Sequence, residues 1–104
     1  MTVKNLTSKN FEEFIKTGTT VIDFSAEWCG PCKIMSPIFE KTSGKVKDVK
    51  FGRVDVDKES ILAQRFYVMS VPTLIFFKNK EQVDRIVGVI DEKELIKKAK
   101  ENVK

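Results

Sequence analysis

The chain has 104 residues, of which 41% are hydrophobic, so it is long enough for one domain with a packed core and too apolar for a disordered chain. Its net charge of +4 comes from interleaved basic and acidic residues, which favours solubility over nucleic-acid binding. The longest unbroken apolar run, residues 74–77, is far shorter than a membrane span, and no signal-peptide segment follows Met1. We therefore expect residues 1–104 to form a single domain of a monomeric, cytoplasmic protein.

The first part of the chain predicts a strand, a helix and a second strand. Residues 3–6 form a short expected strand. Asn10 is followed three residues later by Glu13, which predicts a capping box at the start of a helix that ends near Gly18. Residues 20–24 are apolar at positions that face both sides of a strand, so we place this strand in the middle of a sheet.

Both cysteines lie in the run Trp28-Cys29-Gly30-Pro31-Cys32, between that central strand and the next helix. The following residues have helical apolar spacing as far as Ser43-Gly44, with a kink expected at Pro37. Cys29 should lie at or just before the helix start, with Cys32 one turn into the helix. A helix start presents unpaired N–H groups and a positive dipole end, which favour a thiolate over a thiol.

The rest of the chain continues the alternation of strands and helices. A tight turn at Asn79-Lys80 should place Lys80 at a positive φ, and Asp91 with Glu94 predicts the cap of the last helix. The order strand–helix–strand–helix–strand–helix–strand–strand–helix predicts an α/β fold with a mixed sheet and helices on both faces. The expected strands here are residues 49–56, 73–78 and 81–87, and the expected helices are residues 60–66 and the segment after Asp91.

Three features together resemble the thioredoxin family over nearly the whole chain: the Trp-Cys-Gly-Pro-Cys run, Asp23 six residues before Cys29, and Val71-Pro72-Thr73. A bare C-x-x-C motif is a weak signal, although beside a strand–helix–strand pattern it is a known thioredoxin-like signature. The combination is specific. It implies a thioredoxin fold, with a central mixed five-stranded sheet flanked by four helices and the strand order first, third, second, fourth, fifth. It also implies a protein-disulfide reductase that performs dithiol–disulfide exchange.

Within this chemistry Cys29, expected to be partly exposed, is the candidate nucleophile. Its thiolate would form a mixed disulfide with a partner, and the more buried Cys32 would then release the reduced partner. The alternative is a structural zinc site. Zinc usually takes four ligands, and the chain has no His and no second C-x-x-C, so such a site would need ligands from elsewhere. We expect neither a metal nor an organic cofactor.

Asp23 is an acid within an apolar strand, and burial there would raise its pKa. The resemblance implies that Asp23 accepts the proton of Cys32 as that thiol attacks. The alternative is an acid that faces solvent at a sheet edge. Arg53 matches the position at which the family commonly places a lysine near this acid, so the resemblance implies that Arg53 tunes Asp23.

The resemblance also implies a substrate surface beside the cysteines. The general frequency of X-Pro bonds would favour a trans proline at Pro72, whereas the matching proline of the family is cis and faces the cysteines. The backbone of Val71 would then pair with an extended substrate segment. Exposed apolar contacts would come from Trp28, Gly30, Pro31 and the loop at Gly88-Val89.

The expected partners are oxidised protein disulfides and a thioredoxin-reductase-type electron donor, with no nucleic-acid or membrane partner. One alternative is a disulfide oxidant or isomerase, whose family members usually carry a His between the cysteines. Another is a binding or scaffold module on a thioredoxin fold, in which the cysteines are idle. Acceleration of insulin-disulfide reduction would separate the reductase from the scaffold.

Overall fold

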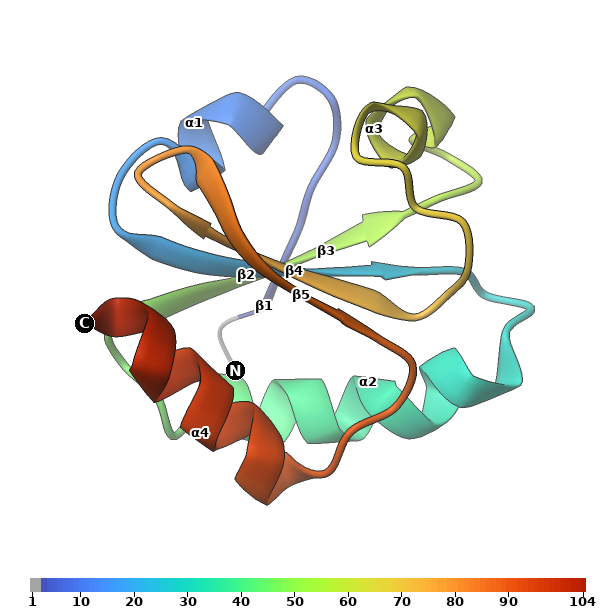
Figure 1. The fold of residues 1–104 in the computed structure, drawn as a ribbon. Helices are drawn as coiled ribbons and strands as arrows, with labels where there is room; N and C mark the ends of the chain where they lie inside the picture. Colours follow the sequence, from blue (N-terminus) through green and yellow to red (C-terminus); the bar gives the residue numbers. More distant parts are fainter. Residues whose placement is uncertain (1–2) are drawn as a thin grey trace.

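The computed structural model describes residues 3–104 and shows a five-stranded sheet in the order β1-β3-β2-β4-β5 (Figure 1). β1, β3 and β2 run parallel, whereas β4 is antiparallel to both β2 and β5. The mixed sheet and its strand order confirm the predicted fold class. The strands are β1 (Val3–Asn5), β2 (Thr19–Ser25), β3 (Val49–Asp55), β4 (Thr73–Lys78) and β5 (Glu81–Val87).

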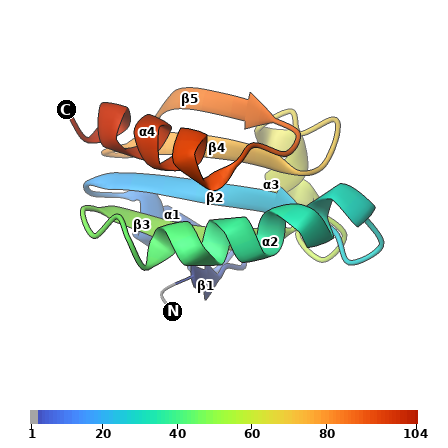
Figure 2. The same ribbon diagram turned by 90° about the horizontal axis from the view of Figure 1, so that it is seen from below.

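Four helices cover the two faces of this sheet. Figures 1 and 2 show α1 and α3 on one face, with α2 and α4 lying across the other. Every predicted strand and helix is present, with ends that differ by a few residues. Within residues 3–104 no helix has the length and apolar character needed to cross a membrane. The helices are α1 (Phe11–Ile15), α2 (Gly30–Ser43), α3 (Ser60–Arg65) and α4 (Glu92–Val103).

β2 is the central strand, and its alternating side chains divide the core into two layers. Val21 packs in the cluster formed with α2 and α4, whereas Ile22 and Phe24 pack in the cluster formed with α1 and α3. Successive side chains of a strand point to opposite faces, so Asp23 shares the face of Val21. The acid therefore lies on the side of the sheet that α2 covers.

The two predicted capping boxes have different outcomes. Asp91 has extended backbone, and its Oδ1 accepts a hydrogen bond from the backbone N–H of Glu94 at 2.8 Å, as predicted. Asn10 does not cap α1, so that prediction was wrong. Its backbone is near the helical region, where the side chain cannot reach forward to the first turn. Its Oδ1 instead accepts from the backbone N–H of Thr7 at 2.8 Å.

Two further local predictions concern a turn and a proline. Asn79 and Lys80 connect β4 to β5 with φ of 48° and 80°, which confirms the positive φ expected at Lys80. α2 continues through Pro37 without a break, and the kink expected there stays a prediction.

Candidate active site

The two cysteines lie where β2 leads into α2. Cys29 is the N-cap residue of α2, with extended backbone, and Cys32 is in the first turn; their sulfur atoms form a disulfide. Cys29 Sγ accepts a hydrogen bond from the backbone N–H of Cys32 at 3.1 Å. Pro31 lies in the first turn, where a missing N–H costs nothing. The position predicted for Cys29, at the start of a helix, is confirmed.

Both cysteines are buried in this disulfide form, which corrects the expected difference in exposure. Cys29 is 3% exposed and Cys32 is 4% exposed. The reason is that both pack in one small apolar cluster, against Ala26, Val56 and Val71. The two residues differ instead in the cavity that each one lines.

Cys29 lines an open groove with a volume of about 530 Å³, which we call the Cys29 groove. Trp28, 69% exposed, stands at this groove, and its Nε1 donates to Asp57 Oδ2 at 2.8 Å. The exposed position predicted for Trp28 is confirmed. The sequence analysis did not identify Val56 and residues 68–70 as part of the site. The only sequence signal for residues 68–70 was that they precede Val71, and the only signal for Val56 was that it lies at the end of a predicted strand. The groove is lined by Trp28, Cys29, Gly30, Pro31, Val56, Val68, Met69, Ser70 and Val71.

The segment before β4 meets the disulfide directly. The Val71–Pro72 peptide bond is cis, as the resemblance implied, and the carbonyl oxygen of Val71 lies 3.6 Å from Cys29 Sγ. Gly88 does not line the Cys29 groove. Its φ is 97°, and its backbone N–H donates to the Pro72 carbonyl at 2.9 Å, so Gly88 stands beside this segment.

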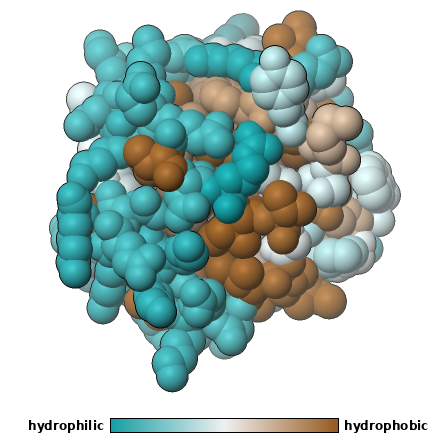
Figure 3. Space-filling model, viewed as in Figure 1, coloured by the Kyte–Doolittle hydropathy of each residue, from teal (hydrophilic) through white to brown (hydrophobic). Residues whose placement is uncertain are grey.

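Apolar side chains are also exposed on both sides of Gly88, the other residue predicted to contact a substrate. Val87 and Val89, which flank Gly88, are exposed, as is Ile34 of α2. Figure 3 shows hydrophilic side chains over the part of this face that α4 occupies, and apolar surface gathered toward the opposite side.

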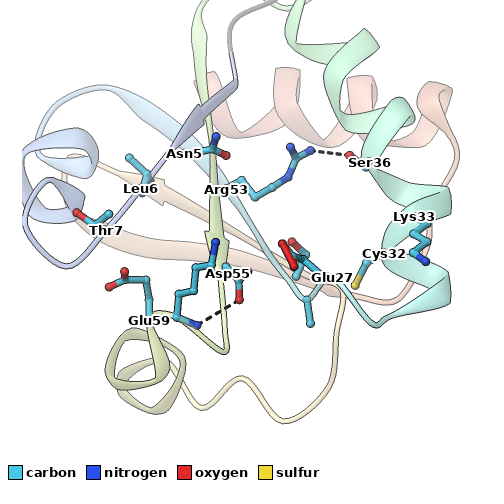
Figure 4. A pocket seen from close by; sticks show the side chains of 13 residues that line it. Asn5, Leu6, Thr7, Glu27, Cys32, Lys33, Ser36, Arg53, Asp55 and Glu59 are labelled. Carbon is cyan, nitrogen blue, oxygen red and sulfur yellow. Dashed lines mark hydrogen bonds between the residues drawn. The ribbon is translucent and has the colours of Figure 1, made fainter.

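Cys32 lines a different cavity of about 470 Å³, the Cys32 pocket, on the side of α2 and β3 (Figure 4). Arg53 reaches from β3 toward α2, where its Nη2 donates to Ser36 Oγ at 3.0 Å and its Nη1 donates to Glu40 Oε2 at 3.5 Å. These contacts hold the guanidinium between the strand and the helix. The lining residues are Asn5, Leu6, Thr7, Ser25, Ala26, Glu27, Cys32, Lys33, Ser36, Arg53, Asp55, Lys58 and Glu59.

Asp23 is fully buried, and its Oδ2 lies 3.7 Å from Arg53 Nε. Neither carboxylate oxygen has a hydrogen-bond partner within residues 3–104. Burial raises the pKa of Asp23 from its ordinary value of 3.8 to about 6, and the positive charge of Arg53 offsets part of that increase. The predicted burial of Asp23 and its position next to Arg53 are confirmed.

Comparisons with known proteins agree with this geometry. A sequence model of the thioredoxin family matches residues 2–101. The chain belongs to the thioredoxin family. The thioredoxin of Chlamydia caviae is 45% identical over 95 residues, which cover 91% of this chain and 93% of the relative. The thioredoxin of Staphylococcus haemolyticus is 43% identical over 89 residues, covering 85% and 86% respectively.

Solved thioredoxin structures have the same fold. A mutant thioredoxin from Halobacterium salinarum NRC-1 superposes with a TM-score of 0.92 at 29% identity, covering 98% of this chain and 91% of that one. The thioredoxin of Malassezia sympodialis gives a TM-score of 0.87 at 36% identity, with the same coverage. Thioredoxins are thiol–disulfide oxidoreductases, and the Cys29–Cys32 pair is placed for dithiol–disulfide exchange, which is the activity of this protein.

The structure offers no set of ligands for the alternative zinc site in the part of the chain that it describes. There, no group of three or more His, Cys, Asp or Glu side chains is arranged to hold a metal ion.

Proposed function

We propose that this protein reduces the disulfides of other proteins by attacking with Cys29 and resolving with Cys32. The position of Cys29 at the start of α2 carries the assignment of roles. Cys29 is the N-cap residue, its Sγ accepts the N–H of Cys32 at 3.1 Å, and it lines the open groove. A hydrogen bond from a helix N-terminus stabilises a thiolate, and the thiolate is the form that attacks a disulfide.

In the first step the reduced protein binds an oxidised partner at the Cys29 groove. The Cys29 thiolate attacks one sulfur of the partner's disulfide, so a mixed disulfide forms and the partner's other sulfur leaves as a thiolate. The backbone of Val71, beside Cys29 Sγ, would pair with an extended segment of the partner, as in strand addition. Trp28, Gly30 and Pro31 would supply apolar contacts, with Gly88 behind this segment.

In the second step Cys32 attacks Cys29 Sγ, which releases the reduced partner and forms the intramolecular disulfide. Cys32 must lose its proton for this attack. Asp23 is the proposed acceptor because its pKa of about 6 leaves it ionised near neutral pH while it still has a substantial affinity for a proton. Arg53 connects the two groups, since it contacts Asp23 and lines the same pocket as Cys32, and it would tune the acid.

The reaction as proposed needs an electron donor that regenerates the reduced protein. A thioredoxin-reductase-type donor would return the Cys29–Cys32 disulfide to the dithiol. The protein would act as a monomeric single domain in the cytoplasm, with neither nucleic acid nor membrane as a partner. The disulfide exchange itself needs only the two cysteines and a proton acceptor, so no metal or organic cofactor is required.

The experiment is insulin-disulfide reduction with dithiothreitol as the electron source. The protein should accelerate precipitation of reduced insulin over the blank, and Cys29→Ser should not, because it has no attacking thiolate. A scaffold module would give the blank rate with both proteins. That result would overturn the proposal.

A further inference from the structure

The two methionines within residues 3–104 lie in opposite environments. Met35 is fully buried beneath α2, in the core that α2 and α4 share with the sheet. Met69 is 91% exposed, in the connection between α3 and β4. It also lines the Cys29 groove, together with Trp28 and Val71. Met69 and the exposed Trp28 line one groove, and adjoining exposed apolar side chains of this kind mark an interaction surface.

The backbone on both sides of Met69 is held by specific hydrogen bonds. The N–H of Val68 donates to the Ala63 carbonyl of α3 at 2.9 Å. The Ser70 carbonyl accepts from Thr73 Oγ1 at 2.7 Å. The side chain of Val68 packs against the core cluster of α1 and α3. The residues on both sides of Met69 are therefore held in place, and this keeps the Met69 side chain at the groove.

We propose that Met69 is an oxidation site, and that its sulfoxide weakens the binding of protein disulfides at the Cys29 groove. This inference rests on the proposed function, because it requires that partners dock on the groove. It assigns to Met69 a role separate from the electron transfer of the cysteines.

The modification is a two-electron oxidation by hydrogen peroxide. The thioether sulfur attacks one peroxide oxygen, the O–O bond breaks, and an S=O bond forms while the other oxygen leaves as water. The sulfur is oxidised and the peroxide is reduced. A methionine sulfoxide reductase reverses the change at the expense of a dithiol, which becomes a disulfide as water is released.

The structure explains why the reaction would select Met69. In the disulfide form neither cysteine is a free thiol, so the most reactive sulfur groups are protected. Met35 is fully buried, which denies access to a peroxide in water. Met69 thus offers the exposed sulfur beside the active site, and it does so in the redox state that accumulates under oxidising conditions.

The consequence follows from the change in polarity. Methionine is flexible and polarizable, so it adapts to different apolar side chains. A sulfoxide puts a strongly polar oxygen at the same place, and a docking partner would desolvate that oxygen without a hydrogen bond in return. We expect the KM for a protein disulfide to rise on the order of three- to tenfold. A small disulfide, which needs no contact with Met69, should be reduced at the same rate as before.

The test treats the disulfide form of the whole protein with hydrogen peroxide, maps the sites by peptide mass, and then measures reduction of insulin and of a small aromatic disulfide. Met69 should gain one oxygen well before Met35, and the insulin KM should rise while the small-disulfide rate stays unchanged. Trp28 lines the same groove and is the only tryptophan, so its fluorescence should shift on oxidation. Met69→Leu, measured before and after the same treatment, should show neither the KM change nor the fluorescence shift.

Two results would overturn the inference. One is complete sulfoxide formation at Met69 with the insulin KM unchanged. The other is a KM increase of the same size in oxidised Met69→Leu, which would place the sensitive group elsewhere. Failure of the proposed function looks different: the untreated protein would then fail to accelerate insulin reduction at all.

Discussion

The surfaces on the two sides of the Cys29–Cys32 disulfide differ strongly in their charged side chains, whereas the two cysteines hardly differ in burial. The sulfur-bearing residues are equally buried, yet the Cys29 groove presents Trp28 and mainly apolar neighbours, whereas the Cys32 pocket contains Arg53 and other charged groups. Polar and charged groups that surround one cysteine can move protons, and an apolar open surface around the other can receive a partner. The division of labour between the cysteines thus comes from their surroundings.

Asp23 gives the Cys32 side a measurable dependence on pH. The pKa of Asp23 in the folded protein, about 6, lies above its ordinary value of 3.8 because the carboxyl is buried. The stability that this group contributes is therefore fully present below 3.8, and it declines as the pH rises through about 6. A difference of about two in pKa corresponds to a loss of about 3 kcal/mol at neutral pH.

The largest effect is expected from Asp23→Asn, which removes the proposed proton acceptor and keeps the shape. Resolution of the mixed disulfide should slow by about 10- to 100-fold, since the buried carboxylate proposed to accept the Cys32 proton is gone. The free energy of unfolding at neutral pH should rise by about 1–3 kcal/mol, because no charge has to be buried. Rapid-quench measurement of mixed-disulfide decay and denaturant unfolding test the two effects.

The pH dependence provides the control for Asp23→Asn. The stability gain should shrink toward zero below 3.8, where the parent carboxyl is already protonated. A variant that is less stable than the parent at every pH, with an unchanged resolution rate, would remove Asp23 from the mechanism.

Selective alkylation of the reduced protein compares the two cysteines directly. Cys29 lines the open groove and accepts a hydrogen bond from the helix N-terminus, so iodoacetamide should modify it about tenfold faster than Cys32 at neutral pH. Peptide mapping after short reaction times measures the ratio. The two cysteines should react at similar rates in denaturant, and equal rates in the folded protein would contradict the assigned roles.

Arg53→Leu should shift the pH dependence of mixed-disulfide resolution by Cys32. Loss of the guanidinium removes the charge that partly offsets burial, so the pKa of Asp23 should rise further, by about one. The pH profile of mixed-disulfide resolution should move upward by a similar amount. Arg53→Lys retains a positive charge and should shift the profile less. If the two variants leave the profile where the parent has it, Arg53 does not tune Asp23.

The smallest effect is expected on the groove side, from Trp28→Ala. Tryptophan is enriched among the interface residues whose truncation costs more than about 1 kcal/mol, so the insulin KM should rise about three- to tenfold. The rate with a small disulfide should change little. Trp28→Phe loses the hydrogen bond to Asp57 and keeps an apolar ring, so its KM should lie between those of the parent and Trp28→Ala. Equal KM values for all three proteins would show that partners do not contact Trp28.

Much of this arrangement could be predicted from the sequence, because local signals carry it. Apolar residues on both faces of the segment 20–24 predicted a central strand with Asp23 buried, and the cysteines were correctly placed at a helix start. The cis bond before Pro72 and the neighbouring Arg53 came from family resemblance. The register that pairs Asp23 with Arg53 joins distant segments, which no local pattern specifies.

The parts that were missed depend on long-range packing. Cys29 was expected to be partly exposed, but Val56 and Val71, far from it in sequence, pack over both cysteines. Val68, Met69 and Ser70 join the groove only because the connection from α3 to β4 folds back to α2. The wrong cap prediction at Asn10 has a local cause instead, because the backbone of Asn10 lies near the helical region.

The most direct test of the division between the two sides is covalent trapping with Cys32→Ser. This variant keeps the attacking thiolate and loses the resolving one, so incubation with an oxidised protein should give a stable mixed disulfide through Cys29. Non-reducing gels and peptide mapping would detect it, and Cys29→Ser should form little or no adduct under the same conditions. An adduct with Cys29→Ser through Cys32, and none with Cys32→Ser, would contradict the account.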